Sequence, residues 1–217
     1  MNKSQKAKLI LKVLNKIYPK TPIPLKHNNK FTLLVSVLLS AQCTDVNVNN
    51  VTKNIYSKYN EPKHFVKLGR KKIETLIKSI GIFRVKAKSI YNMSKQIIAN
   101  HSGRVPRSFE ELEKLPGVGH KTASVVMSQG FGYPAFPVDT HIHRLAQRWR
   151  LSNGKNVIQT EKDLKKLFPR ESWNKLHLQI IYYGREHCKA RDCYGISCKI
   201  CSACNPKQKK PLKTKKA

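Results

Sequence analysis

The nine residues Leu115-Pro-Gly-Val-Gly-His-Lys-Thr-Ala123 decide the fold of this chain. Gly117 and Gly119 stand one residue apart between apolar residues, and a helical pattern follows them. Glycine adopts backbone angles that other residues avoid, so a tight turn here brings backbone N–H groups close to a ligand. Because a helix N-terminus favours anions, we expect the turn to hold a phosphate. Lys121 is then either a charge contact to that phosphate or a nucleophile.

The charge of the chain favours a polyanionic partner. Its 217 residues include 43 Lys+Arg and only 12 Asp+Glu, a formal net charge of +31. Nucleic acid fits best, since each phosphate that a protein neutralises releases counterions. A general bias toward lysine is an alternative explanation for part of the excess of positive charge. The sequence contains no basic helix with aromatic anchors, so it does not predict binding to a membrane surface. Lys12 and Lys16 interrupt the first apolar residues, so we expect no secretory signal, a cytoplasmic (in a bacterium, nucleoid-associated) location and unpaired cysteines.

Helical spacing dominates the sequence. Apolar residues recur at intervals of three and four over 9–17 and form one helix face. Further helices are predicted at 31–39, 46–59, 71–80, 85–99, 109–115, 121–128, 140–150, 160–167 and 173–187. No convincing run of strands occurs, so the predicted fold class is all-α with short loops. Residues 206–217 hold six lysines and no aromatic residue, which predicts a disordered basic tail.

Four ordered motifs and a C-terminal group of cysteines carry a family resemblance. The motifs are Leu38-Leu-Ser-Ala-Gln-Cys-Thr-Asp-Val46, Ser79-Ile-Gly-Ile-Phe-Arg-Val-Lys-Ala87, the nine residues quoted above, and Val138-Asp-Thr-His-Ile-His-Arg144. Together they resemble the endonuclease III family of helix-hairpin-helix DNA glycosylases. The resemblance implies two helical lobes with a DNA cleft between them. One is a six-helix lobe over 22–132, and the other combines 1–21 with 133–205.

The resemblance gives Lys121 and Asp139 the catalytic roles. A lysine amine attacks a sugar carbon only when it is unprotonated, and a helix N-terminus with many neighbouring cations disfavours the ammonium form. In the family this lysine attacks C1′ and expels the base, and β-elimination from the resulting Schiff base breaks the strand. The alternative for Lys121 is a phosphate contact. Asp139 precedes a helical pattern, so it is also read as an N-cap.

Residues that contact DNA are assigned by the same resemblance. Gln42 would enter the space that the extruded nucleotide leaves, and Ile82, where the family usually has leucine, would wedge the opposite strand. Their alternatives are a polar helix-end residue and a loop anchor. His141 would lie near the catalytic pocket, and His120 would face DNA from the hairpin. Expected contacts to the DNA backbone also come from Gly117, Gly119, Lys189, Arg191 and Lys199.

Five cysteines within seventeen residues indicate a metal site. Four thiolates suit zinc or a [4Fe–4S] cluster, and the resemblance favours [4Fe–4S]. The family spacing is C-x6-C-x2-C-x5-C, from which this chain departs. We expect the ligands to be Cys188, Cys198, Cys201 and Cys204, with Cys193 as the alternate; a rival set is 188, 193, 198 and 204. The cluster would order a basic loop. Cys43 is expected to be a buried small residue.

The sequence therefore predicts a bifunctional DNA glycosylase and AP lyase that acts on oxidised pyrimidines. Its partner would be double-stranded DNA with damaged bases or abasic sites, and it would work as a monomer. One alternative is a monofunctional mismatch glycosylase of the same fold, a class that lacks the hairpin lysine. Another is a non-catalytic helix-hairpin-helix protein, which would need neither Asp139 nor the cysteines.

Overall fold

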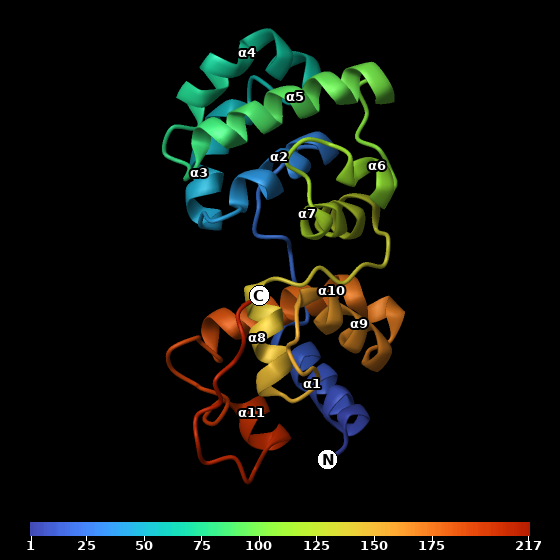
Figure 1. Ribbon diagram of the computed structural model, residues 1–217, viewed down its shortest axis with the longest axis vertical. Coiled ribbons are helices and arrows are strands. Elements are labelled where there is room, and N and C mark those ends of the chain that lie inside the picture. The colour runs from blue at the N-terminus through green and yellow to red at the C-terminus, as the bar shows by residue number, and fades with distance from the viewer. The chain divides into compact units, whose positions relative to one another are not determined.

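The computed structural model describes residues 1–217, and every regular element in it is a helix (Figure 1). The all-α prediction is confirmed. The chain forms two compact units, which we call the inner unit, Ile23–Tyr133, and the split unit, Met1–Pro22 with Pro134–Ala217. The lobes expected from the sequence were 22–132 and 1–21 with 133–205. Their two internal boundaries lie one residue from those of the units, and the split unit also includes residues 206–217, which were expected to be a separate tail. None of the helices combines the length and the apolar character that a membrane span requires.

The inner unit is built around α2, a helix buried on all sides. Asn29 caps its N-terminus, and nine of its eleven residues are buried, as expected of an almost wholly apolar helix. It packs against α3, α5 and α7, and α4 lies alongside α5 (Figure 1). The elements of this unit are α2 (Lys30–Ser40), α3 (Asp45–Tyr56), α4 (Pro62–Leu76), α5 (Phe83–His101), α6 (Phe109–Glu113), α7 (His120–Val125) and the π-helical turn η1 (Val126–Gly130).

The sequence prediction was least accurate at α4. It placed a helix at 71–80, whereas α4 begins at Pro62 and ends at Leu76. Proline is well accommodated in the first turn of a helix, where its missing N–H costs no hydrogen bond. Gly69 then interrupts the helical backbone with a φ of 72°, so the two halves of α4 present different faces and the apolar periodicity is broken.

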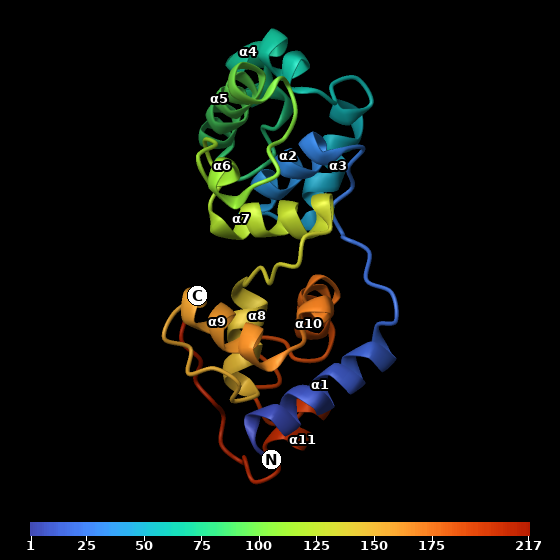
Figure 2. The same ribbon diagram turned by 90° about the vertical axis from the view of Figure 1, so that its right-hand side faces the viewer.

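The split unit joins the two ends of the chain. Helix α1 packs against α9, α10 and α11, and α10 packs against α8 (Figure 2). A separate apolar core, which includes Trp149, Tyr183, Phe136 and Ile10, lies between these helices. The elements are α1 (Lys3–Ile17), α8 (Thr140–Arg148), α9 (Val157–Leu167), the 3-10 turn η2 (Arg170–Ser172), α10 (Trp173–Glu186) and α11 (Lys199–Cys204).

The C-terminal tail, residues 206–217, follows a defined course along the split unit, where the composition predicted disorder. The backbone N–H of Leu212 donates to the Tyr194 carbonyl at 2.9 Å. The Gln147 side chain donates to the Lys215 carbonyl at 3.1 Å and accepts from the Lys215 N–H at 2.8 Å. A side-chain amide that pairs with both backbone groups of one residue acts like a short strand pairing, which composition alone does not reveal.

Candidate active site and metal centre

The glycine turn packs closely onto the inner unit on one side and is open on the other. Gly117 has a φ of 81°, and a Cβ there would lie 2.8 Å from Ser89 Cβ and 3.1 Å from Leu38 Cδ1. Only glycine allows both this backbone angle and this approach to α5 and α2. Gly119, the N-cap of α7, has nothing within 4 Å of such a Cβ. The turn is therefore held from beneath while its outer surface stays accessible.

Lys121 lies in the first turn of α7, and its side chain is exposed. Its neighbour His120 is held within the hairpin: His120 Nδ1 lies 2.8 Å from Glu113 Oε1, and its ring stacks on Phe109 with 6.1 Å between centroids. These contacts join the start of α7 to α6. The helix that presents the Lys121 amine is thus fixed at its N-terminus by a side chain that sequence reasoning had assigned only to DNA contact.

Asp139 caps α8 in the split unit, as its alternative interpretation from the sequence stated. Its Oδ1 accepts the Ile142 N–H at 2.8 Å, and the side chain is half-buried. The hydrogen bond fixes the carboxylate at the start of α8. Asp139 therefore offers a fixed negative charge, which suits the stabilisation of positive charge on a reacting sugar. Lys121 belongs to the inner unit and Asp139 to the split unit.

The two histidines that follow Asp139 have different surroundings. His141 Nδ1 lies 3.3 Å from Arg144 Nη2, and its ring lies against Gly184 of α10. Burial lowers the pKa of His141, although the charge of Asp139 opposes this shift. His143 is buried, and its Nδ1 lies 2.8 Å from the Thr160 hydroxyl. His143 thus belongs to the core of the split unit.

The loops that carry Gln42 and Ile82 lie side by side in the inner unit. A Cβ on Gly81 would lie 3.5 Å from the Gln42 carbonyl oxygen, and Asn47 Nδ2 donates to the Ser79 carbonyl at 3.1 Å. Gln42 and Ile82 are both exposed, and both have left-handed backbones, with φ of 54° and 57°. For L-residues this conformation costs about 1–2 kcal/mol each, and it is rare for a β-branched side chain.

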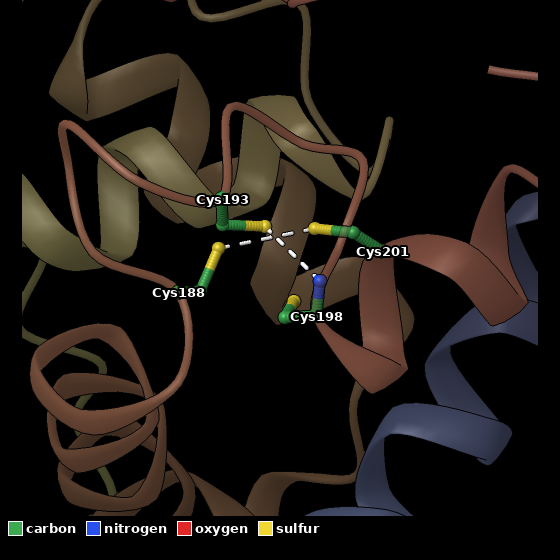
Figure 3. A group of neighbouring side chains, drawn as sticks. All are labelled: Cys188, Cys193, Cys198 and Cys201. Atoms are coloured by element: carbon green, nitrogen blue, oxygen red, sulfur yellow. Dashed lines mark hydrogen bonds between the residues drawn. The ribbon is translucent and has the colours of Figure 1, made fainter. Parts of the chain in front are cut away.

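Four cysteine side chains converge in the split unit. They are Cys188, Cys193, Cys198 and Cys201, which we call the four-cysteine group (Figure 3). Their sulfur atoms all lie within 4.8 Å of one another, and all four residues are buried. Cys188 follows α10, Cys193 lies in the turns after it, and the other two lie at the start of α11. Thiolates alone, without carboxylate or carbonyl ligands, are a soft donor set that suits iron–sulfur clusters or zinc.

The group differs by one member from the set expected from the sequence. It includes Cys193, the alternate ligand, and leaves out Cys204. Cys204 is buried on α11 three residues after Cys201, about one turn further along that short helix. Its sulfur is not among the four that converge within 4.8 Å of one another. The sequence prediction chose Cys204 because it used only the intervals between cysteines along the chain. These intervals do not reveal the turns between 190 and 197.

Two arginines, Arg148 (buried) and Arg144 (half-buried), hold the loop that begins at Cys188, and sequence reasoning missed both. Arg148 donates to the Lys189 carbonyl at 2.7 Å and to the Ala190 carbonyl at 2.9 Å, and its Nη1 lies 3.3 Å from Cys188 Sγ. Arg144 donates to the Cys188 carbonyl at 3.0 Å. Their spacing by four on the inward face of α8 is the pattern that could have revealed them. Lys189 and Arg191, the expected phosphate contacts, are exposed on this loop, as is Lys199 on α11.

Comparison with known proteins settles the family. Residues 35–170 match the HhH-GPD superfamily of base excision DNA repair proteins. Endonuclease III of Bacillus subtilis (strain 168) is 44% identical over 198 residues, 91% of this chain and 90% of the relative. The chain belongs to the endonuclease III family. Endonuclease III of Escherichia coli (strain K12) is 40% identical over 212 residues, covering 96% of this chain and 99% of that protein.

Solved structures show the same relationship. A trapped endonuclease III–DNA covalent intermediate is similar with a TM-score of 0.87 and 41% identity over 92% of this chain and 94% of that one. A thermostable thymine-DNA glycosylase at 23% identity, with a TM-score of 0.79, shares the fold. The chain is thus a base excision repair enzyme, a DNA glycosylase/AP lyase. Endonuclease III homologues are iron–sulfur enzymes, and the four-cysteine group could hold a [4Fe–4S] cluster.

Proposed function

We propose that this enzyme removes oxidised pyrimidines from double-stranded DNA and then cleaves the strand, with Lys121 as the nucleophile. The observation that carries the proposal is the exposed Lys121 amine in the first turn of a helix that Gly117 and His120 hold in place. DNA is the partner because the chain carries a net charge of +31 and resembles an endonuclease III in complex with DNA. We propose that it acts as a monomer in the cytoplasm, where bacterial DNA is found.

In the proposed reaction the uncharged Lys121 amine attacks C1′ of the damaged nucleotide. The bond between C1′ and the base breaks, its electron pair leaves with the base, and the base gains a proton. The nitrogen supplies that proton and keeps its other one. The C1′–O4′ bond then breaks, O4′ takes the electron pair and a proton from water, and a protonated Schiff base forms between the nitrogen and C1′. Loss of a 2′ proton then expels the 3′ phosphate by β-elimination. Asp139, fixed by the Ile142 N–H, stabilises positive charge on the sugar as the base departs.

Gln42 and Ile82 serve the step before chemistry. The target nucleotide must leave the base stack, which costs a few kcal/mol. Gln42 would fill the vacated space, and the exposed Ile82 would separate the opposite strand. Lys189, Arg191 and the glycine turn, Gly117 to Lys121, would hold the flanking phosphates. His141 would border the pocket next to Asp139.

The four-cysteine group, Cys188, Cys193, Cys198 and Cys201, would hold the [4Fe–4S] cluster. Bound there, the cluster supplies iron–thiolate bonds that cross-link the loop and α11. These bonds order the basic segment that carries Lys189 and Arg191 for contact with DNA. Arg148 supports the same loop through its backbone carbonyls.

Borohydride trapping on DNA with one abasic site tests the nucleophile. Wild-type protein should form a covalent complex, and Lys121→Gln should form none while keeping its affinity for DNA within about threefold. Lys114→Gln is the matched control, since Lys114 is another exposed lysine of the hairpin, paired only with Glu110 and Glu111. It should trap as wild type does. Undiminished lyase activity in Lys121→Gln would overturn the assignment.

A panel of duplexes tests the substrate class. We expect release of thymine glycol and 5-hydroxycytosine, and little release of 8-oxoguanine, 3-methyladenine or mismatched thymine. Base release by the wild-type protein without trapping or strand cleavage would instead favour the monofunctional alternative. Binding without any base release would favour the non-catalytic one.

A further inference from the structure

Lys86 is a buried lysine that the proposed chemistry does not use. Its residue is 6% exposed, and its Nζ donates to the Leu39 carbonyl at 2.9 Å and to the Ala41 carbonyl at 2.6 Å. No carboxylate lies within ion-pair distance of it. Burial lowers the pKa of Lys86, which reflects the cost of keeping an ammonium group out of water. An apolar side chain would fill a place on this inward face of α5 at lower cost, so the amine itself has a purpose.

The two acceptors show what the amine does. Leu39 lies in the last turn of α2, and Ala41 is the residue that ends the helix. Carbonyls at a helix C-terminus lack partners within the helix and favour a positive charge. The next residue is Gln42, whose left-handed backbone has a φ of 54°. Lys86 therefore fixes the backbone immediately before Gln42.

The same residue is tied to Ile82. Its backbone N–H donates to the Ile82 carbonyl at 3.1 Å, the first hydrogen bond of α5. Ile82 caps that helix in a left-handed conformation, with φ 57° and ψ 34°. Lys86 thus holds the Ile82 turn through its main chain and the Gln42 turn through its side chain. On the surface, Asn47 joins the two loops again through the Ser79 carbonyl and Cys43 Sγ.

We propose that Lys86 is a positioning residue for base extrusion: its buried amine fixes Gln42 beside Ile82, so that both side chains are in place before the nucleotide leaves the stack. This inference rests on the proposed roles of Gln42 and Ile82 in extrusion. Both residues hold an unfavourable backbone conformation that the surroundings must impose. Pre-set geometry matters because a displacement of about 1 Å can cost about a hundredfold in rate.

Lys86→Met tests the proposal, because methionine keeps the length and apolar stem and removes the donors. Lys88→Met is the matched control: it removes the same charge from an exposed position of the same helix. The measurement is the single-turnover rate of base release from thymine glycol, either paired with adenine or opposite an abasic analogue. Extrusion costs less when the lesion has no partner base.

We expect Lys86→Met to slow release from the paired duplex by about 10- to 100-fold and from the unpaired duplex by less than about threefold. Lys86→Arg, which keeps charge and donors, should recover most of the paired rate, and Lys88→Met should match wild type. A variant that is only less well folded would lose the same factor on both duplexes, which would overturn the proposal, as would an unchanged paired rate.

Should Lys86→Met fail to fold, as judged by circular dichroism, Lys86→Gln carries the test, because the glutamine keeps a polar donor at this buried position but is shorter and lacks the positive charge that faces the Leu39 and Ala41 carbonyls. It should slow release from the paired duplex more than from the unpaired one, and equal slowing or none would overturn the proposal. Failure of the proposed function can be told apart from failure of this inference, since the wild-type protein would then release no oxidised pyrimidine from either duplex.

Discussion

Cys193 and Cys204 form a matched pair that decides which cysteines bind the cluster. Both are buried, at 2% and 3% exposure, but only Cys193 belongs to the four-cysteine group. Replacing either with alanine removes one sulfur from the core of the split unit, at about 1 kcal/mol. For a domain of this size that lowers the melting temperature by about 4–8 °C. This loss of packing is the same in both variants.

Loss of the cluster adds a second contribution to the change in stability, and this contribution differs between the two variants. Metal binding contributes directly to folding free energy when the site exists only in the folded state. We expect Cys204→Ala to keep the iron content and the brown visible band of wild type. Cys193→Ala should lose most of its iron and melt at least about 10 °C below Cys204→Ala, because it forfeits several kcal/mol of ligation as well as the packing.

The assay measures iron and acid-labile sulfide per chain on proteins purified without oxygen, together with thermal melts before and after cluster removal. After removal the two variants should melt alike, since only the packing loss remains. Loss of iron in Cys204→Ala with retention in Cys193→Ala would refute the reasoning and restore the ligand set expected from the sequence. A colourless wild type that contains zinc would refute the [4Fe–4S] assignment itself.

Two further predictions concern the hairpin and the pH dependence of stability. Gly117→Ala should destabilise the inner unit by about 2–3 kcal/mol, because its Cβ would lie 2.8 Å from Ser89 Cβ at a φ of 81°. Gly119→Ala should keep the stability of the wild type and weaken DNA binding. Equal denaturation midpoints for the two variants would contradict this prediction. Burial lowers the pKa of His143 below its usual 6.5, so the unfolded chain takes up this proton first. The contribution of His143 to the free energy of unfolding should therefore fall as the pH drops below about 6.5, by at most about 1.4 kcal/mol per pH unit. His143→Gln should remove this share of the slope in urea titrations and leave the share of His141, whose pKa burial also lowers.

Much of the fold was predictable because local patterns and tertiary packing agree. The 3.6-residue periodicity located both ends of α2, α5 and α10 to within two residues. It found the end of α1 but not its start at Lys3, and the glycine turn was read directly from Gly117 and Gly119. The first half of α4 was missed because a glycine bend changes its buried face at Gly69. The six-residue α11 is too short to show a period, and its cysteines were read for spacing alone.

The candidate site was predictable only where a motif marked it. Lys86, Arg144 and Arg148 carry charges, which sequence patterns assign to the surface, yet each is at least half-buried against backbone carbonyls. Their partners lie about 40 or more residues away in sequence, so no local pattern reports them. The choice between Cys193 and Cys204 likewise depends on turns whose course is set by contacts with Arg148 and not by their own composition.

The division of the chain has a consequence for how the protein is made. In the sequence, the inner unit comes between the two segments of the split unit, and it has a core of its own. As the ribosome releases the chain from its N-terminus, the inner unit can therefore complete itself first. Helix α1 emerges before it but packs on α9, α10 and α11, which are synthesised last. Its apolar face, with Ile10 and Leu14, waits uncovered until then. The cluster-binding half of the enzyme is thus the last to mature.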